Sequence, residues 1–170
     1  MILTIRNKSL RKTCELVDFA DPTLPKLIED LRNELLAING RGIGISANQI
    51  GVNKQVSLIL FPDNWTSKID ITGIKKEYVL INPRITNYGP KVKVDEGCLS
   101  VPGVFAIIER SESCEVLNHA LNGEEEIISA KGILAQALQH EIDHLNAKLF
   151  TDYFSKAQQI IYENKIRRIK

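Results

Sequence analysis

This chain of 170 residues has few cysteines, no long apolar run and almost no excess of charge of either sign. Its three cysteines do not suit the disulfide framework of a secreted protein and fit a reducing compartment; Cys14 and Cys114 are expected to be small buried hydrophobes. No apolar run approaches the roughly 18–20 residues of a membrane span, and the stretch 1–6 is too short for a signal-peptide core. Lys and Arg total 22 against 21 for Asp and Glu, and a formal net charge of +1 argues against a general nucleic-acid coat protein.

The composition that remains is ordinary for a globular protein, with 44% hydrophobic and 25% charged residues. The chain has no repeat at a fixed period, no low-complexity segment and no Gly/Ser-rich linker that would mark a boundary. We therefore expect residues 1–170 to form one domain with a sizeable core, located in the cytoplasm.

Three segments have the apolar spacing of helices, at about 22–38, 131–146 and 155–170. Asp21 is the predicted N-cap of the first helix, with Pro22 just inside it, and Ser155 is the predicted N-cap of the last. The middle segment is apolar on more than one side, which is typical of a buried helix.

Short β-branched and apolar segments lie between these helices and are separated by turn residues: 55–61, 78–81, 104–108, 115–118 and 126–129. The turn signals fall at 62–64, 82–83, 88–90 and 122–123, and Asn122-Gly123 predicts a hairpin. Strands in one block with few helices between them favour an α+β fold with antiparallel sheets over βαβ units.

The predicted buried helix carries two histidines, His140 and His144, four residues apart. They lie about 40° apart around a helix, so both imidazoles leave the same face and can bind one cation. Glu141 is one position on, where a carboxylate can take a proton from water that the metal activates. The alternative is two unrelated histidines on a charged surface, but unpaired His and Glu are costly on a buried helix. The segment therefore predicts a metal site.

A catalytic metal needs a third protein ligand and an open position. Downstream of His144 the only acids are Asp152 and Glu163, and there is no further histidine. Upstream, Cys98 lies in the glycine-containing turn 96–100, where the backbone can come close to another group. A thiolate ligand would select a soft or borderline cation.

The glycine-rich stretch 42–49 follows a helix rather than a strand, which argues against a dinucleotide-binding loop. It is either a loop that ends the helix or a loop whose bare backbone pairs with the backbone of a ligand. Gln49, at its end, has an amide that can donate to a developing oxyanion.

In their order and separations, the segments 42–49, 96–100 and 139–144 closely resemble those of peptide deformylases. The resemblance covers nearly the whole chain, including the strand end at 81–83 and the carboxy-terminal helix. It implies a hydrolase that removes the formyl group from the N-terminal formyl-methionine of newly synthesised proteins and releases formate. It also implies an α+β fold in which antiparallel sheets surround the metal-bearing helix.

The resemblance implies a role for each residue that matches the family's motifs. The ligands of one divalent metal would be Cys98, His140 and His144. The metal would be Fe²⁺ in the cell, with Zn²⁺, Ni²⁺ or Co²⁺ in preparations. Glu141 would be the general acid/base, while Gln49 and the backbone N–H of Leu99 would stabilise the oxyanion. Apart from the resemblance, the charges of Arg110 and Asp143 predict a pair that supports the ligand helix, and the alternative is two separate charges in solvent.

Substrate-binding residues are expected around the methionine side chain and the peptide backbone: Ile43, Gly44, Ile45, Val94, Gly97, Ile133, Gln136 and Ala137. The chain departs from the family pattern at Ser46, Gln136 and Phe105, which bears on the side-chain preference rather than on the reaction.

Rival functions make different demands on these residues. A metalloendopeptidase of the His-Glu-x-x-His type has no use for Cys98, and a structural metal site would need a fourth Cys or His as a ligand. A formyl-binding domain without turnover would not need an intact Glu141.

The expected partners are nascent formyl-methionyl polypeptides, with no membrane and no sequence-specific nucleic acid. The last helix is basic and is expected to dock on the ribosome near its exit tunnel rather than to join the active site: Lys156, Lys165, Arg167, Arg168 and Lys170 stand against Glu163. The alternative is that Ile160, Ile161 and Ile166 simply pack on the domain. The location would be the cytoplasm, or an organellar matrix if a transit peptide has been removed.

Overall fold

The structure is a computed structural model that describes residues 1–62 and 74–169. Over these ranges the chain forms three α-helices: α1 (Leu24–Ala37), α2 (Gly132–Leu145) and α3 (Lys156–Arg167). Short 3₁₀ helices lie at η1 (Lys8–Arg11), η2 (Ala47–Ile50) and η4 (Phe150–Tyr153). The strands are β1 (Gly44–Ser46), β2 (Val56–Pro62), β3 (Ile74–Ile81), β4 (Arg84–Tyr88), β5 (Lys91–Gly97), β6 (Phe105–Ser111), β7 (Ser113–His119) and β8 (Glu125–Lys131).

The strands form three antiparallel sheets within the described residues, with the orders β1-β2-β3, β4-β7-β8 and β5-β6. In the first sheet Ile45 pairs with Leu58, and in the two-stranded sheet Glu96 pairs with Ala106. The antiparallel α+β architecture predicted from the sequence is therefore confirmed.

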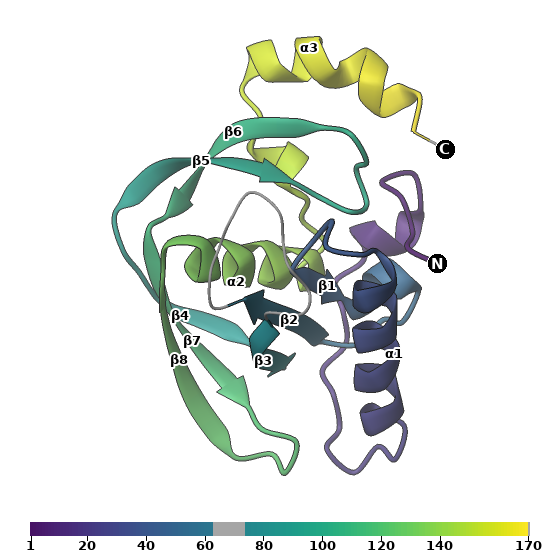
Figure 1. The fold of residues 1–170 in the computed structure, drawn as a ribbon, viewed down its shortest axis with the longest axis vertical. Coiled ribbons are helices and arrows are strands. Elements are labelled where there is room, and N and C mark those ends of the chain that lie inside the picture. The colour runs from purple at the N-terminus through teal and green to yellow at the C-terminus, as the bar shows by residue number, and fades with distance from the viewer. Residues whose placement is uncertain (63–73, 170) are drawn as a thin grey trace.

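Helix α2 runs through the middle of the molecule, between the sheets (Figure 1). Leu138 is fully buried in a cluster with Ile59 and Leu80 of the first sheet and Val116 of the second. A helix covered on several sides is apolar most of the way round, which is the pattern seen in its sequence. The predicted span 131–146 matches α2 and the two residues that cap it.

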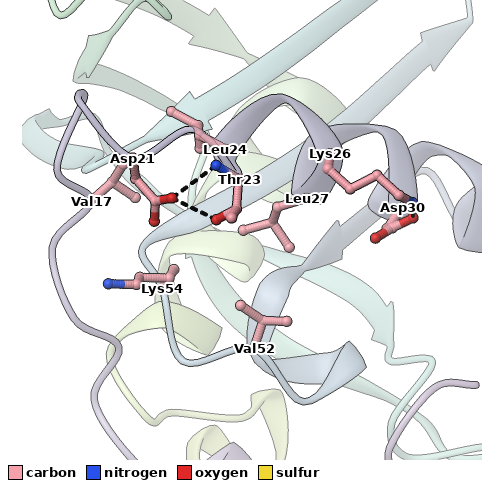
Figure 2. Close-up of a pocket in the computed structure, with 9 residues that line it drawn as sticks. All are labelled: Val17, Asp21, Thr23, Leu24, Lys26, Leu27, Asp30, Val52 and Lys54. Carbon is pink, nitrogen blue, oxygen red and sulfur yellow. Dashed lines mark hydrogen bonds and ion pairs between the residues drawn. The ribbon is translucent and has the colours of Figure 1, made fainter.

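Helix α1 covers the first sheet with four buried side chains spaced by three or four residues: Leu24, Ile28, Leu31 and Leu35. Its N-cap is Thr23, so the prediction of Asp21 as the cap is wrong. The Asp21 carboxylate accepts bonds from the backbone N–H and the hydroxyl of Thr23 (Figure 2). Asp commonly bonds the backbone two residues on, and here that turn delays the start of the helix. The helix ends before Asn39 and Gly40, whose positive φ angles of 53° and 79° fit the predicted stop.

The strands extend beyond the segments predicted from β-branched residues, and β1, β4 and β5 have no counterpart among them. In β5 the exposed positions Lys91, Lys93 and Asp95 alternate with less exposed ones, so no continuous apolar run marks the strand. The predicted hairpin at Asn122-Gly123 joins β7 to β8. The predicted turn at 62–64 falls largely outside the described residues.

Helix α3 lies along β6, with Ser155 as its N-cap as predicted. The side chains of Gln158 and Tyr162 donate to the carbonyl oxygens of Ile107 and Phe105, at 2.7 Å each. Two alternate carbonyl groups of β6 therefore accept hydrogen bonds from side chains of α3, where a further strand would otherwise pair.

Only some of the apolar residues of α3 pack on the domain. Ile166 packs in a cluster with Val101 of the turn after β5. Ile160 and Ile161 are 74% and 69% exposed, so they do not pack on the domain. The alternative interpretation, in which all three isoleucines pack on the domain, therefore holds for Ile166 alone.

Within the residues that the structure describes, no helix is long and apolar enough to cross a bilayer. A hollow of about 230 Å³ opens beside the start of α1, between Leu24, Leu27 and Val52, with Lys26 and Lys54 at its rim (Figure 2). None of its lining residues belongs to the motifs discussed above.

Candidate active site

His140 and His144 project from the same face of α2, as their spacing predicts. Their Nε2 atoms lie 3.2 Å apart, and their rings meet edge to face with centroids 4.9 Å apart. His144 is 1% exposed, and the side chain of His140 is 12% exposed. Two imidazole nitrogens that face each other at this distance inside a protein are arranged as ligands of one cation.

Cys98 completes the set from the turn that follows β5. Its Sγ is 3.2 Å from Nε2 of His144, and the three ligand atoms lie within 4.8 Å of one another. In a tetrahedral site with bonds of 2.0–2.1 Å, two nitrogens are about 3.3 Å apart, so the donor set fits a divalent metal. The backbone N–H of Ser100 donates to Sγ at 3.4 Å.

The downstream acids that were alternatives to Cys98 have other partners. The Asp152 carboxylate binds the Arg11 guanidinium through two hydrogen bonds, at 2.6 and 2.9 Å. Glu163 pairs with Arg167 on α3. The structure therefore brings Cys98 to the histidines and leaves both acids in ion pairs.

A buried ion-pair network supports the ligand helix from the side of β5 and β6. Nδ1 of His140 lies 2.6 Å from Oε1 of Glu96, and Arg110 donates to both oxygens of that carboxylate at 2.7 and 3.0 Å. Arg110 also donates to Asp143 at 2.5 Å, which confirms the predicted pair. Burial alone would raise the pKa of Glu96, but the hydrogen bonds from His140 and Arg110 lower it to about 2. The network therefore holds a charged carboxylate against the metal ligand His140.

Glu141 lies beside the ligand cluster and is 3% exposed. Ser46 donates its hydroxyl to Oε2 at 2.7 Å. A Cβ placed on Gly44 would come within 2.3 Å of Oε1, so only glycine leaves room for this carboxylate. Burial raises the pKa of Glu141, against opposing effects of His140 and Ser46. A buried carboxylate with a raised pKa next to a metal site can accept and return a proton.

Gln49 is 1% exposed, and both ends of its amide are held. Its Oε1 accepts from the backbone N–H of Ser46 at 2.8 Å. Its Nε2 donates to the Ser100 hydroxyl at 3.0 Å and lies 3.9 Å from Sγ of Cys98. The amide N–H groups are thus aimed at the ligand cluster. Leu99 follows Cys98, and its side chain lies against Gly42.

The substrate-binding candidates are spread over several surfaces. Gly44 borders Glu141, and Gly97 lies under the ring of Phe105. Gln136 donates its Nε2 to the Asp95 carbonyl oxygen at 2.9 Å, which ties α2 to β5. Ile45 is fully buried in the cluster that α1 covers, because alternation along β1 points it away from the face that Gly44 presents to Glu141.

The remaining candidates pack on other clusters or stay partly exposed. Ile43 and Ala137 pack in the cluster of α2 and the sheets. Val94 packs against the cluster that contains Phe150, and Ile133 is half-buried.

Sequence reasoning did not find the roles of Glu96 and Ser46. Both act on the helix motif from far along the chain, since Glu96 is 44 residues from His140 and Ser46 is 95 residues from Glu141. The signal was there in part, because each residue lies inside one of the three motif segments.

A cysteine and two histidines around one position, with a buried carboxylate beside them on the same helix, define a mononuclear metal-dependent hydrolase. The family model described as Polypeptide deformylase matches residues 1–159. Peptide deformylases from Elusimicrobium minutum and Pelagibacter ubique are 43% and 38% identical to the chain, covering 85% and 99% of it and 81% and 94% of the relatives. The crystal structure of a peptide deformylase from Legionella pneumophila superposes with a TM-score of 0.85 at 35% identity, covering 99% of this chain and 93% of that one.

The chain belongs to the peptide deformylase family and has the hydrolase activity of that family. Its substrates are nascent peptides that carry an N-formyl group. The resemblance stated from the sequence is confirmed, and the metalloendopeptidase alternative is set aside.

Proposed function

We propose that Glu141, Gln49 and the backbone N–H of Leu99 carry out the deformylation step around the cation held by Cys98, His140 and His144. The observation that carries this proposal is the position of the buried Glu141 carboxylate next to the ligand cluster. A divalent cation held by these residues would supply Lewis acidity, which would lower the pKa of a water molecule and polarise the formyl oxygen.

Glu141 moves the proton. Its Oε2 is occupied by the Ser46 hydroxyl, so Oε1, beside Gly44, takes the proton of the attacking water. The hydroxide adds to the formyl carbon, the C–N bond then breaks, and Glu141 returns the proton to the leaving amine. The products are formate and a peptide with a free amino terminus.

Gln49 and Leu99 stabilise the charge that develops on the formyl oxygen. The amide of Gln49 is fixed by Ser46 and Ser100 before substrate arrives, so it need not reorganise during the reaction. The N–H of Leu99 is the second donor. Seven of the eight candidates would receive the methionine side chain and the adjoining backbone: Ile43, Gly44, Val94, Gly97, Ile133, Gln136 and Ala137. Ile45 is left out because its side chain is buried in the cluster that α1 covers.

The proposed cofactor in the cell is Fe²⁺, with Zn²⁺, Ni²⁺ or Co²⁺ able to take its place in preparations. A thiolate with two imidazoles suits both iron and zinc. The test is a formate-release assay on a formyl-Met peptide with Fe²⁺ and Zn²⁺ protein side by side. Higher turnover of the Fe²⁺ protein supports the assignment, and equal or higher turnover with Zn²⁺ contradicts it.

We further propose that the protein is cytoplasmic, or lies in an organellar matrix, and that α3 docks on the ribosome near its exit tunnel. Lys156, Lys165 and Arg167 are exposed on α3, and Arg168 is exposed at its C-cap. There they would contact RNA phosphates in a salt-dependent manner. Arg167 is paired with Glu163 on the same helix, which reduces its share of that contact.

The docking test compares the wild type with a variant in which Lys165, Arg167 and Arg168 are all Ser. In a control variant with the same loss of charge, Ser replaces Arg84, Lys91 and Lys93, which are exposed on β4 and β5. We expect weaker ribosome binding at low salt for the α3 variant only, with unchanged activity on a free formyl-Met peptide. Equal ribosome binding by the wild type and the α3 variant would rule out docking through these residues.

A further inference from the structure

Tyr153, on η4, stands at the surface end of a chain of polar contacts that leads to the metal ligand His140. Its hydroxyl donates to Oδ1 of Asp143 at 3.0 Å, and the other oxygen of Asp143 accepts from Arg110 at 2.5 Å. Arg110 donates to the Glu96 carboxylate, and Oε1 of Glu96 lies 2.6 Å from Nδ1 of His140. Each link is a hydrogen bond between charged or strongly polar groups, so a change at one end alters the orientation of the next group.

Tyr153 also covers the guanidinium of Arg110. The centre of its ring is 4.4 Å from the guanidinium carbon, a cation–π contact. Arg110 is 3% exposed, whereas Tyr153 is 40% exposed. The ring therefore lies between solvent and the ion pair of Arg110 with Glu96, and an ion pair kept from water is stronger.

The position of Tyr153 is set by the backbone that carries it. Asp152 accepts from the Leu149 backbone N–H at 2.9 Å and holds Arg11 through its carboxylate. Phe150, on the same 3₁₀ helix, is 1% exposed and its ring centroid is 6.4 Å from that of His140. Burial and the neighbouring Asp143 raise the pKa of Tyr153 to about 12, so its hydroxyl remains a donor at neutral pH.

We propose that Tyr153 is a positioning residue for the metal ligand His140, acting through Asp143, Arg110 and Glu96. Its ring and hydroxyl fix the guanidinium of Arg110, which holds Glu96 where it accepts from Nδ1 of His140. The Nε2 atom of His140 then faces Cys98 and His144 as a ligand. This proposal rests on the proposed ligand set, and it extends the support of the metal from buried groups to a residue at the surface.

The test measures how fast the protein gives up Co²⁺ to a chelator, followed by the visible absorption of the thiolate–cobalt centre. The variants are Tyr153→Ala, which removes ring and hydroxyl, and Tyr153→Phe, which keeps the ring. The control is Tyr78→Ala, because Tyr78 also lies under a cation, Lys76 at 4.7 Å, and packs against the cluster of α2. Tyr78 is not part of the chain of contacts to His140. Thermal midpoints of all variants are recorded alongside.

Partners one step closer to a metal ligand are worth about 10–100-fold in affinity, so we expect release about 3–10-fold faster for Tyr153→Ala. We expect the Phe variant to fall between Tyr153→Ala and the wild type, and Tyr78→Ala to release cobalt at the wild-type rate even if its midpoint falls. An unchanged rate in Tyr153→Ala, or an equal acceleration in Tyr78→Ala at a similar midpoint, overturns the positioning role. A wild-type protein that holds no cobalt would instead refute the ligand set, and this proposal with it.

Discussion

Replacing Gly44 by Ala tests whether the placement of the Glu141 carboxylate limits the reaction. The new Cβ would lie 2.3 Å from Oε1, 2.8 Å from Cδ and 3.0 Å from Cγ of Glu141. Ordinary van der Waals contact at a Cβ begins at 3.4 Å, so the carboxylate must move by about 1 Å. Its other oxygen is held by the Ser46 hydroxyl at 2.7 Å, so the movement breaks or bends that bond.

A displacement of 1 Å at a reacting group can cost about 10²-fold in rate, and we expect a loss of this size in kcat/KM. The clash is with the end of a side chain rather than with backbone, so the fold should be kept, and the metal ligands are not displaced. The assay is formate release from a formyl-Met peptide, with metal content and thermal midpoint measured on the same protein. The control is Gly42→Ala, whose Cβ meets only side-chain methyls at 3.3 to 3.4 Å. A Gly44→Ala enzyme with near wild-type kcat/KM would refute the reasoning, and one that has lost its metal would show that the effect is not on Glu141.

Removing any one ligand should sharply reduce metal retention, because two side chains hold a divalent ion poorly. We expect a low metal content in Cys98→Ala, His140→Ala and His144→Ala, measured by metal analysis after gel filtration. Normal metal content in Cys98→Ala would contradict the proposed ligand set. Acid should weaken the fold through Glu96, whose pKa of about 2 is lowered from an ordinary value of 4.5. Such a group stabilises the fold fully above pH 4.5 and loses that effect as the pH falls towards 2, which amounts to about 2 kcal/mol between pH 6 and pH 3. Urea unfolding should show this extra loss in the wild type relative to Glu96→Gln, and parallel pH profiles of the two proteins would contradict it.

The parts of the fold that could be predicted from the sequence are those governed by local periodicity. The 3.6-residue pattern of α2 and the spacing of His140 and His144 describe one rigid element, so the helix and its ligand face follow directly. The glycine-containing turn marked Cys98 as a candidate ligand, and the resemblance to peptide deformylases placed it in the ligand set. The N-cap of α1 could not be predicted from the sequence. Asp21 can bond the backbone either as a cap or as a turn, and the choice is made by packing.

The supporting interactions of the site could not be predicted, since they join residues far apart in the chain. Arg110 was paired with Asp143 in advance, yet its two bonds to Glu96 depend on the register of β5 against β6. Tyr153 enters the network only because η4 folds back over Arg110. Side-chain networks of this kind depend on tertiary placement, which no local pattern encodes.

Glu141→Gln provides the most direct test of the central claim that a metal-bound site with one buried carboxylate removes the formyl group. The substitution keeps the shape of the side chain and removes the proton acceptor, while Cys98, His140 and His144 are untouched. Metal content and formate release from a formyl-Met peptide are measured on the same samples. We predict full metal content with turnover reduced by about 10²–10⁴-fold or more. Near wild-type formate release from the Gln variant would contradict the account.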